Sequence, residues 1–548
     1  MATHGVTNQV PPLPEYDVFG CDAVLTAALQ RWGDPADAHG LHQLGALAGS
    51  QTARGWGDDA DRSQPRLRTH SPRGDRADDV DYHPAYHSLL GTAVANGLTA
   101  EPWTRPQGSS AHLRRALGFV VWSQVEAGHG CPVSMTYAAV PALHRDPGLA
   151  DRWVPRLASR RYEPDLLPVA EKSAALCGMA MTEKQGGSDV RTNSTHAVPA
   201  SAGRVPGEAY RLTGHKWFCS APMSDGFLML AQAPGGLTCF VVPRVLDDGS
   251  RNSFALQRLK DKLGNRANAS AEVELDGTWA SRLGEEGRGV STILDMVAAT
   301  RLDCVLGSAA TMRQALVRAI HHARHRYAFG ALLVDQPLMR LVLADLTLES
   351  EAATLLGLRL AAAVDEGDMA FTRLAVAAAK FWVCKRTAPM VAEALECLGG
   401  NGYVEENGLA RLYREAPLNS IWEGSGNVNA LDVLRAASRE PQSVAALDKE
   451  LALARGFDLR LDAAIAGVLA ELDRLSSLSA TEAQMGARRL VRSIAVTLEA
   501  ALLVRHSPAV VADAFLASRL SGDAGRVFGE LDLGLTEAGQ IVERGFGA

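Results

Sequence analysis

The chain has 548 residues, of which 47% are hydrophobic and 21% are charged, and its formal net charge is −7 at pH 7. This length predicts several domains, and the composition is typical of a globular protein with a large core. The negative charge excludes a general electrostatic attraction to nucleic acid or to acidic membranes, so any such surface has to be local.

The eight cysteines are scattered without CxxC pairs, and some lie in apolar runs. This pattern favours buried free thiols in a reducing compartment over disulfides or a zinc site. The first residues lack the basic start and apolar stretch of a signal peptide, and no apolar run reaches transmembrane length. We therefore expect a cytoplasmic protein without a membrane partner and without a metal.

Residues 1–170 are predicted to form an N-terminal extension and a helical domain. Residues 1–50 are expected to hold one helix, at 23–32, whereas residues 51–81 are rich in Arg, Asp, Gly and Ser and are interpreted as an extended loop. Helical spacing of apolar residues then runs from residue 87 to residue 157, and Pro132 is expected in the first turn of a helix.

Around residue 170 the periodicity changes. Short strand-like runs separated by turn-forming clusters occur at 176–181, 210–214, 227–231, 237–243 and 271–275. They predict a small antiparallel β domain at residues 171–283.

After Gly289 the helical spacing returns, with apolar stripes at 312–327, 338–358, 371–398, 446–475 and 484–504. These stripes predict a C-terminal four-helix domain at 284–440 and an extra helical domain at 441–548. The expected fold class is α+β and mostly α, in the order helices, β insert, helical bundle.

One stretch between two of these helices combines a glycine turn with an acid. The glycines at 399–400 are expected to end one helix, and the next is expected to begin near Asn427 and to bury Val428, Leu431 and Leu434. Between them Glu423 follows Trp422, and a carboxyl group beside a large ring at a helix start is a candidate desolvated general base. An exposed acid in an ordinary helix–turn–helix is the alternative. Glycine turns at helix ends also bind dinucleotide phosphates through free N–H groups.

Three further segments carry polar motifs: MTEKQGGSDV at 181–190, TGHKWFCSAP at 213–222 and ARHRYAFG at 323–330. Each alone has an ordinary explanation, namely a hairpin loop, a core tryptophan and a cationic helix C-terminus. In this order, and with LGGNGY at 398–403 and EGS at 423–425, they resemble the acyl-CoA dehydrogenase family over roughly residues 85–435. The resemblance implies FAD as cofactor, an acyl-CoA substrate, and the family's helical, β, helical order of domains.

Other segments resemble the alkylation-response, or AidB-type, branch of that family: DYHPAYH at 81–87, QVEAG at 124–128, CPVSMTYAA at 131–139, KDKLGNRANAS at 260–270 and NSIWEGSGN at 419–427. The extra C-terminal region also fits that branch. The resemblance implies an FAD-containing homotetramer associated with defence against DNA alkylation. It also implies weak dehydrogenation, of a short branched thioester such as isovaleryl-CoA.

The resemblance assigns roles residue by residue. Glu423 would be the catalytic base, and the position from which some relatives supply the base instead is occupied by Thr300. Trp217 would cover the flavin ring, and Arg326 would reach FAD bound mainly by another subunit. The cofactor-binding residues that it implies are Met181, Thr182, Ser188, Trp217, Phe218, Cys219, Arg326, Phe329, Gly399, Gly400, Gly402, Tyr403, Ile421, Trp422, Gly424, Ser425 and Asn427.

One residue departs from the family's pattern. Glu396 stands shortly before the glycine turn, where a glutamine is usual, and it places an extra negative charge near the pyrophosphate. Such a charge either weakens FAD binding or meets a compensating arginine, and the sequence leaves both open.

The alternative function is that of a DNA-binding protective flavoprotein with a vestigial dehydrogenase site. Residues 441–548 hold 11 Lys and Arg against 14 Asp and Glu, so this region is not basic overall. Local candidates for binding double-stranded DNA without sequence preference are Arg435, Arg439, Arg488, Arg489 and Arg492. The same arginines also fit a solvated helix face or ion pairs between subunits.

Overall fold

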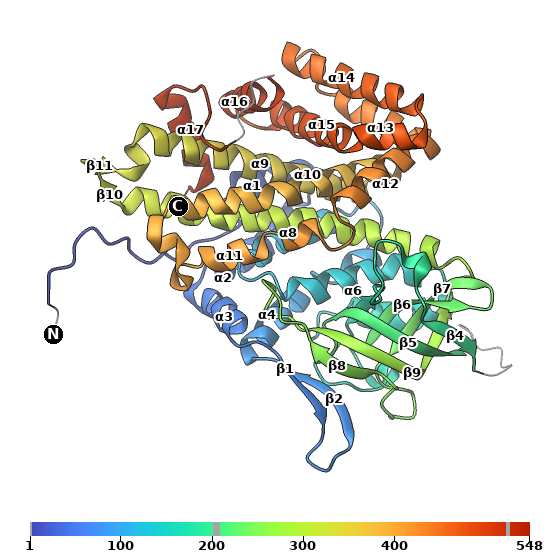
Figure 1. Ribbon diagram of the computed structural model, residues 1–548. Coiled ribbons are helices and arrows are strands. Elements are labelled where there is room, and N and C mark those ends of the chain that lie inside the picture. The colour runs from blue at the N-terminus through green and yellow to red at the C-terminus, as the bar shows by residue number, and fades with distance from the viewer. Residues whose placement is uncertain (1–2, 201–208, 522–526, 548) are drawn as a thin grey trace. The chain divides into compact units, whose positions relative to one another are not determined.

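The protein is described here from a computed structural model, which describes residues 3–200, 209–521 and 527–547. It divides into two compact units, each assembled from separate stretches of the chain (Figure 1). Unit 1 comprises Met1–Gln51, Gln107–Gln124 and Cys304–Ala548, and unit 2 comprises Thr52–Pro106 and Val125–Asp303. The α+β, mostly helical class predicted from the sequence is confirmed.

Unit 2 is built around a seven-stranded sheet. Its strands are β3 (Cys177–Ala180), β4 (His196–Pro199), β5 (Ala209–Ser220), β6 (Gly226–Ala233), β7 (Gly236–Pro243), β8 (Ala255–Leu259) and β9 (Ser270–Leu283). The order is β3-β6-β4-β5-β9-β7, with β8 beside β9, and β6 also pairs with β7, so the sheet closes on itself. Most pairs are antiparallel, and β3 and β4 run parallel to β6.

The strands form where the sequence provides β-branched and aromatic residues for a shared interior. In β6 and β7 the apolar runs are continuous, and Phe227, Leu228 and Phe240 are fully buried. Strands β5 and β9 are longer than their apolar cores suggest, because polar residues such as Lys216 pair across the ladder with Val273. This extension brings the TGHKWFCSAP motif into a regular strand.

The rest of unit 2 consists of helices and one hairpin: α3 (Gln51–Arg62), β1 (Arg66–His70), β2 (Arg76–Asp81), α4 (Pro84–Ala95), α6 (Gly130–Leu143) and α7 (Pro147–Leu157). The expectation of an extended loop at 51–81 is therefore wrong. Polar contacts hold the hairpin, which has no large apolar face. Arg68 pairs with Asp81 at 2.9 Å, and the Asp78 carboxylate accepts a hydrogen bond from the Leu256 N–H of β8 at 2.8 Å.

Unit 1 is a bundle whose long helices lie alongside one another (Figure 1). Its first elements are α1 (Ala23–Trp32), α2 (Ala38–Ala48), α5 (Ala111–Ser123), the second part of α8 (Gly289–His325), β10 (Tyr327–Ala328), β11 (Ala331–Leu332), α9 (Pro337–Asp365), α10 (Met369–Glu396), α11 (Leu409–Glu415) and α12 (Gly426–Arg439). Helix α1 has the bounds predicted for it, but the expectation of a single helix in residues 1–50 is wrong, because α2 follows it. Helices α9 and α10 are buried on most sides, which explains why apolar residues follow one another closely there.

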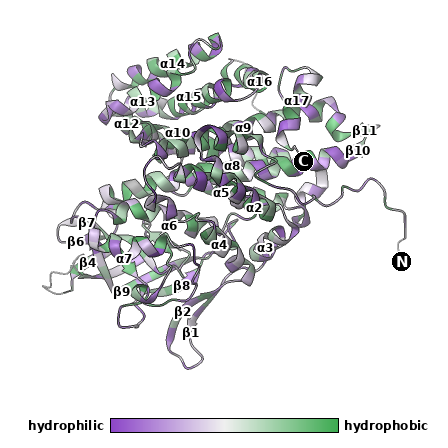
Figure 2. Ribbon diagram, turned by 180° about the vertical axis from the view of Figure 1, so that it is seen from behind, coloured by the Kyte–Doolittle hydropathy of each residue, from purple (hydrophilic) through white to green (hydrophobic). Residues whose placement is uncertain are grey.

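Five more helices complete unit 1: α13 (Pro441–Ala452), α14 (Leu459–Ser476), α15 (Ala480–His506), α16 (Ala509–Leu520) and α17 (Leu535–Gly545). The single stripe predicted at 446–475 is thus two helices, each with hydrophobic and polar faces (Figure 2). Ion pairs with buried acids of α9 fasten this region. Arg519 of α16 meets Glu349 at 3.0 Å, a carboxylate that Arg386 of α10 also contacts at 2.7 Å, and Arg544 of α17 meets Glu351 at 2.7 Å. Loss of Arg544 would remove the cation that pairs with the buried Glu351, which is costly for a buried charge.

Helix α12 begins where it was predicted, but it buries a different face. Leu431 is exposed, whereas Asn429 and Asp432 are buried. Asp432 is ion-paired with Arg373 at 3.1 Å, and Asn429 binds backbone carbonyls of the preceding turn. Polar residues that are buried for such reasons are invisible to a search for apolar periodicity.

All eight cysteines are free thiols, and seven of them are buried. Within the described ranges, no helix is long and apolar enough to cross a membrane. The same ranges contain no cluster of three or more His, Cys, Asp or Glu side chains that could hold a metal ion.

Candidate active site and cofactor-binding residues

The turn before α12 holds Glu423 in an unusual backbone conformation. Its φ is 58°, in the left-handed region that residues with a side chain rarely adopt, and Gly424 follows with a φ of 97°. Such a conformation costs on the order of 1–3 kcal/mol and persists only where its surroundings enforce it. Strain of this kind concentrates at functional sites, and Glu423 is one of seven non-glycine residues with a positive φ in the described parts of the chain.

A buried lysine of α10 holds this turn from below. The Lys380 ammonium donates a hydrogen bond to the carbonyl oxygen of Trp422 at 2.9 Å and another to that of Gly424. These two carbonyls flank Glu423, and Lys380 is 1% exposed. One charged group therefore fixes the peptide units on both sides of the candidate base.

Neutral hydrogen bonds complete the support of the turn. The Asn429 amide donates to the carbonyls of Gly424 and Ser425 at 2.7 and 3.0 Å. The Trp422 indole N–H donates to the Asn419 side chain at 2.8 Å, which fixes the ring that the sequence places beside the acid. Both donors act on the segment that connects α11 to α12, so its shape depends on several groups.

The glycine turn after α10 is the second motif of unit 1. Helix α10 ends at Glu396, and Gly399 then takes a φ of 58°. A Cβ at Gly402 would come within 2.1 Å of the Leu395 carbonyl oxygen, so this position accepts only glycine. Around Gly399 and Gly400 the space is open, and both residues are exposed. The turn is thus rigid on one side and accessible on the other.

The ARHRYAFG motif lies at the end of α8 and in the small hairpin after it. The Arg326 guanidinium donates to the Asn8 carbonyl oxygen at 2.7 Å, and the Tyr327 N–H donates to the Asn8 side chain at 2.8 Å. Phe329 sits at the hairpin tip with a φ of 51° and is 98% exposed. Arg326 is therefore partly engaged by the N-terminal segment, whereas Phe329 projects outward.

Large hydrophobic side chains of these motifs are unusually exposed. Besides Phe329, Tyr403 is 83% exposed and Ile421 is 64% exposed. Most exposed apolar residues are unremarkable singly, but aromatic side chains with this degree of exposure are typical of surfaces that a ligand or another subunit covers. The residues present in unit 1 thus fit a dinucleotide that lies over exposed rings and an open glycine turn.

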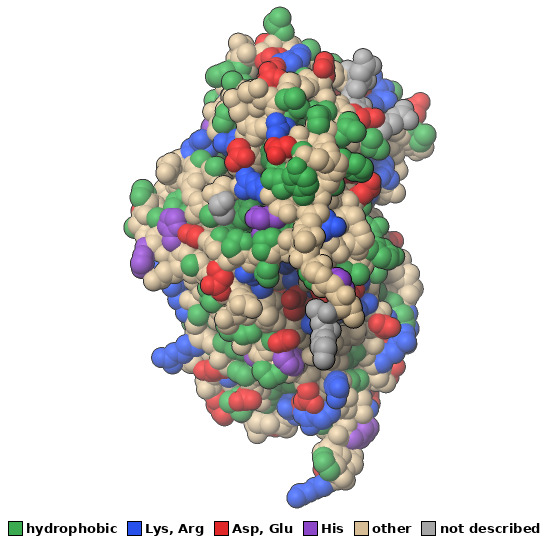
Figure 3. Space-filling view, turned by 90° about the vertical axis from the view of Figure 1, so that its left-hand side faces the viewer, with side chains coloured by type: hydrophobic (Ala, Val, Ile, Leu, Met, Phe, Trp, Pro, Cys, Tyr) green, Lys and Arg blue, Asp and Glu red, His purple; other side chains and the backbone are tan. Residues whose placement is uncertain are grey.

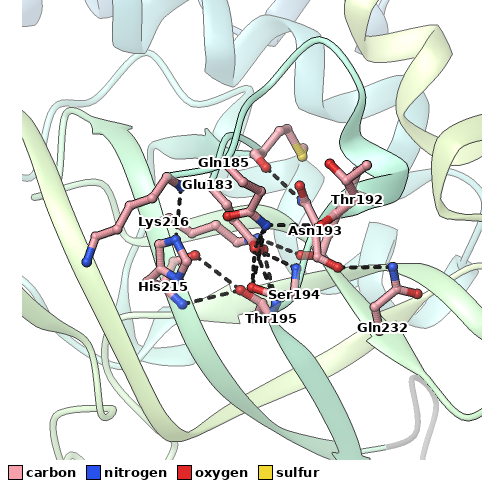
Figure 4. Close-up of polar contacts among 12 residues, drawn as sticks. Glu183, Gln185, Thr192, Asn193, Ser194, Thr195, His215, Lys216 and Gln232 are labelled. Atoms are coloured by element: carbon pink, nitrogen blue, oxygen red, sulfur yellow. Dashed lines mark hydrogen bonds and ion pairs between the residues drawn. The ribbon is translucent and has the colours of Figure 1, made fainter.

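In unit 2 the MTEKQGGSDV loop is fixed to β5 by a buried ion pair (Figure 4). Lys216 of β5 contacts Glu183 at 2.8 Å and also donates to the Leu230 carbonyl at 2.7 Å. Glu183 further accepts from the Ser194 N–H at 2.6 Å and the Thr195 N–H at 3.2 Å. Burial raises the pKa of Glu183, but Lys216 and these hydrogen bonds outweigh it and bring the pKa to about 2. The loop is thereby held at both ends by one carboxylate.

This loop meets the tryptophan of the second motif directly. The backbone N–H of Trp217 donates a hydrogen bond to the backbone carbonyl oxygen of Thr182 at 2.8 Å. Met181 and Thr182 are half-buried and Ser188 is exposed. The predicted loop and strand residues are therefore brought together in unit 2.

On β5 the side chains after Trp217 alternate between surface and core. Phe218 is 49% exposed, whereas Cys219 is completely buried among the interior residues of the sheet. The Cys219 thiol is therefore directed away from Phe218, and only its backbone remains for contact with a flavin. The Lys260 ammonium lies 3.2 Å from the centre of a Trp217 ring and is held by Glu272 at 2.6 Å.

Residue roles that the sequence did not reveal are those of Lys380, Lys260 and the Glu183–Lys216 pair. Lys380 interrupts the run AVAAAKFW, and a single lysine within a buried apolar stretch is the signal that would have marked it. Lys260 and Glu183 lie in motifs that were noted, but their contacts depend on strand pairing and were not readable from spacing.

The five arginines proposed for DNA are all exposed, but three of them have partners. Arg489 pairs with Glu471 at 2.9 Å, Arg435 approaches Asp432 at 3.5 Å, and Arg488 donates to the Asn427 side chain at 3.2 Å. Arg439 and Arg492 form no ion pair with any described residue. On the face of the molecule shown in Figure 3, acidic and basic side chains are interspersed and form no continuous basic track.

Comparison with known proteins agrees with this arrangement of motifs. Residues 8–164 match the model of the adaptive response protein AidB N-terminal domain, residues 178–278 the acyl-CoA dehydrogenase middle domain, and residues 287–438 the acyl-CoA dehydrogenase C-terminal domain. The putative acyl-CoA dehydrogenase AidB of Escherichia coli is 46% identical over 84% of this chain and 86% of its own length. The chain belongs to the acyl-CoA dehydrogenase family, in its AidB-type branch.

Other members share the architecture. Acyl-CoA dehydrogenase family member 11 of Caenorhabditis elegans is 31% identical over 82% of this chain and 77% of its own length. The crystal structure of Caenorhabditis elegans ACDH-11 in complex with C11-CoA superposes with a TM-score of 0.83 at 27% identity, covering 100% of this chain and 93% of that one. As a member of this family, the protein is an acyl-CoA dehydrogenase-like oxidoreductase with FAD as its cofactor.

Proposed function

We propose that the protein removes hydrogen from the α and β carbons of an acyl-CoA thioester and that Glu423 is the catalytic base. The observation that carries this proposal is the enforced left-handed conformation of Glu423 above the buried Lys380. The surrounding hydrogen bonds hold the backbone carbonyls of the residues before and after this acid.

The reaction requires the removal of a proton from the α carbon and of a hydride from the β carbon. The Glu423 carboxylate accepts the α-proton of the thioester, which is weakly acidic, and the β carbon loses a hydride, so the C–C bond becomes a double bond. Bound FAD supplies the two-electron acceptor for that hydride. A positioned general base contributes roughly 10²–10⁴ in rate, which sets the size of the effect expected when Glu423 loses its function.

Each unit contains residues that are proposed to contact FAD. In unit 2 they are Met181, Thr182, Ser188, Trp217 and Phe218, with the backbone of Cys219. In unit 1 they are Arg326, Phe329, Gly399, Gly400, Gly402, Tyr403, Ile421, Trp422, Gly424, Ser425 and Asn427. The exposure of Phe329 and Tyr403 supports a homotetramer in which these side chains cover FAD bound by a neighbouring subunit. Glu396, shortly before the glycine turn at 399–400, is exposed and has no ion pair among the described residues. This favours weakened FAD binding over a compensating arginine within the chain.

The acyl group is proposed to be either short and branched or of medium length. The resemblance to the alkylation-response branch favours an isovaleryl-like substrate and slow turnover. The C11-CoA complex of the worm relative supports a longer chain. Both thioesters are therefore needed as probes.

Anaerobic reduction of the flavin by isovaleryl-CoA and by C11-CoA tests the proposal. Glu423→Gln removes the carboxylate but keeps the size of the side chain, so we expect unchanged FAD content and a loss of about 10²–10⁴ in the reduction rate. Glu406→Gln is the matched control, because Glu406 is an exposed acid in the neighbouring segment, which connects α10 to α11. Bleaching of Glu423→Gln at the wild-type rate would show that the proton leaves to another group.

A second candidate function is non-specific binding of double-stranded DNA within a response to alkylation damage. It is favoured by two observations: Arg439 and Arg492 are exposed without ion-pair partners among the described residues, and residues 8–164 match a domain named for the adaptive response. The dehydrogenase reading does not depend on it.

A further inference from the structure

We propose that Lys380 is the positioning residue of the catalytic turn and acts on the reaction only through Glu423. This inference rests on the proposed role of Glu423 as base. The ammonium group lies under the turn, with hydrogen bonds to the carbonyl oxygens of Trp422 and Gly424. It touches neither substrate nor cofactor in this role, because its bonds end on the backbone.

The contacts of Lys380 are those expected of a clamp. A buried ammonium normally needs a carboxylate partner, since the desolvation of an unpaired charge is costly. Among the described residues no acid pairs with Lys380, and its bonds go to two carbonyls that stand one residue before and one residue after Glu423. The ammonium is therefore retained at a site where its only visible use is to hold these two carbonyls together.

The same bonds account for the strained backbone. Carbonyls on both sides of Glu423 can converge on one cation only if the chain reverses between them, and the φ of 58° at Glu423 provides that reversal. Asn429 donates to the Gly424 carbonyl as well, but it does not reach the Trp422 side of the turn. Without Lys380 the Trp422 carbonyl loses the donor that pins it, so Glu423 is free to relax toward an ordinary conformation.

Displacement of a catalytic group by about 1 Å is enough to cost on the order of 10² in rate. We therefore expect Lys380→Met, which keeps the apolar stem and removes the ammonium, to slow flavin reduction by about 10²-fold. Other cations near the turn, Lys385 and Arg488, remain in place in this variant.

The matched control is Lys385→Met. Lys385 lies on the same helix, one turn further along, and its ammonium approaches Gly426 without bonding to the carbonyls around Glu423. This variant removes an equal charge from the same neighbourhood but leaves the clamp intact. A general electrostatic role would affect both variants alike, whereas a clamp predicts a large effect only for Lys380→Met.

A structural readout that does not need turnover is hydrogen–deuterium exchange of the full-length protein. In Lys380→Met the amides of residues 422–425 should exchange faster, while peptides of α9 and α15 keep their wild-type protection. Lys385→Met should resemble the wild type throughout. Unchanged exchange at 422–425 in Lys380→Met would overturn the proposal, and so would a general loss of protection or of FAD, because both make Lys380 an ordinary stabilising residue.

A double-mutant cycle separates this inference from the proposed function. If Lys380 acts through Glu423, Lys380→Met should add nothing to the rate loss of Glu423→Gln, since residues that act as one unit are not additive. Additive losses would overturn the clamp while leaving Glu423 as the base. Wild-type reduction rates in Glu423→Gln itself would overturn the proposed function. Lys380→Gln, whose amide group keeps two N–H donors, should recover part of the rate.

Discussion

At the scale of single residues, two lysine side chains contact the residues that carry the candidate site. Lys380 lies under the Glu423 turn, and Lys260 lies against the ring of Trp217. Neither lysine was assigned a role from the sequence. Motifs identify the groups that face a ligand, whereas the groups that orient them are visible only once the strands and helices are paired.

The contact between Lys260 and Trp217 leads to a prediction. A cation that lies over an indole is worth roughly 0.5–2 kcal/mol, depending on how far it is desolvated. We expect Lys260→Met to loosen the Trp217 ring, which should change the tryptophan emission of the protein and weaken FAD binding by up to about tenfold.

Lys184→Met is the control for this change. The Lys184 ammonium lies 5.8 Å from the Trp217 ring centre and forms no ion pair among the described residues. Lys184→Met removes the same charge from a position farther from the ring. If both variants bind FAD equally, the close approach of Lys260 does not orient the ring.

At the scale of elements, the long helices and the main strands were predictable because their apolar residues repeat at 3.6 or 2 residues. What periodicity could not give is the burial of polar side chains. Helix α12 buries Asn429 and Asp432 because they bind carbonyls and Arg373, so its apolar stripe was misplaced. The hairpin β1–β2 was missed for the same reason, since its charges pair with one another and with β8.

The residues of the candidate site also fall into those that the sequence motifs identified and those that only the structure shows. Glu423, Trp217 and the glycine turn were found because a known family uses those residue types in that order. Cys219 was included for the same reason, yet the alternation of β5 turns its thiol into the core. The pairing of Glu183 with Lys216 required the register of the sheet, which the sequence alone did not supply.

Two buried Lys–carboxylate pairs of unit 2 make opposite pH predictions. The pKa of Glu183 is about 2, below its ordinary 4.5, so the stability it contributes is present above pH 4.5 and is lost as the pH falls toward about 2. At Asp225 burial raises the pKa and the neighbouring Lys172 lowers it. The effect of burial is larger, so the pKa of this carboxyl group rises from 3.8 to about 6. Its contribution is present below pH 3.8 and is lost as the pH rises through about 6.

These signs can be measured on Glu183→Gln and Asp225→Asn. The destabilisation by Glu183→Gln should be largest near neutral pH and should shrink between pH 4.5 and 2, as followed by thermal unfolding. Asp225→Asn should instead become relatively more stable as the pH rises from 4 to 7. Only Glu183→Gln should also weaken FAD binding, because Glu183 holds the loop that meets Trp217, whereas Asp225 bonds to Lys172 and to the Leu176 N–H. Equal losses of FAD would make the Glu183 pair merely structural.

At the scale of the whole molecule, the net charge of −7 works against DNA binding, and a local arginine surface has to overcome it. Helix α15 offers Arg488, Arg489 and Arg492, of which Arg489 is already paired with Glu471. Phosphate contacts release counterions, so each neutralised phosphate adds about −0.9 to the slope of log binding constant against log salt. Binding through these arginines should therefore be weak at physiological salt, indifferent to sequence and steeply salt-dependent.

The experiment is a salt titration of duplex DNA binding by the FAD-loaded protein. Replacing Arg488, Arg489 and Arg492 by alanine should make the log–log slope shallower by up to about 3, and by about 2 if Arg489 stays with Glu471. A control with the same charge change replaces Arg66, Arg73 and Arg191, three exposed arginines of unit 2. If α15 carries the contact, only the first variant changes the slope, at unchanged FAD content. If the slope changes equally in the α15 variant and in the control variant, the arginines of α15 belong to a solvated helix face. If the wild type binds no duplex even at low salt, the dehydrogenase remains as the function.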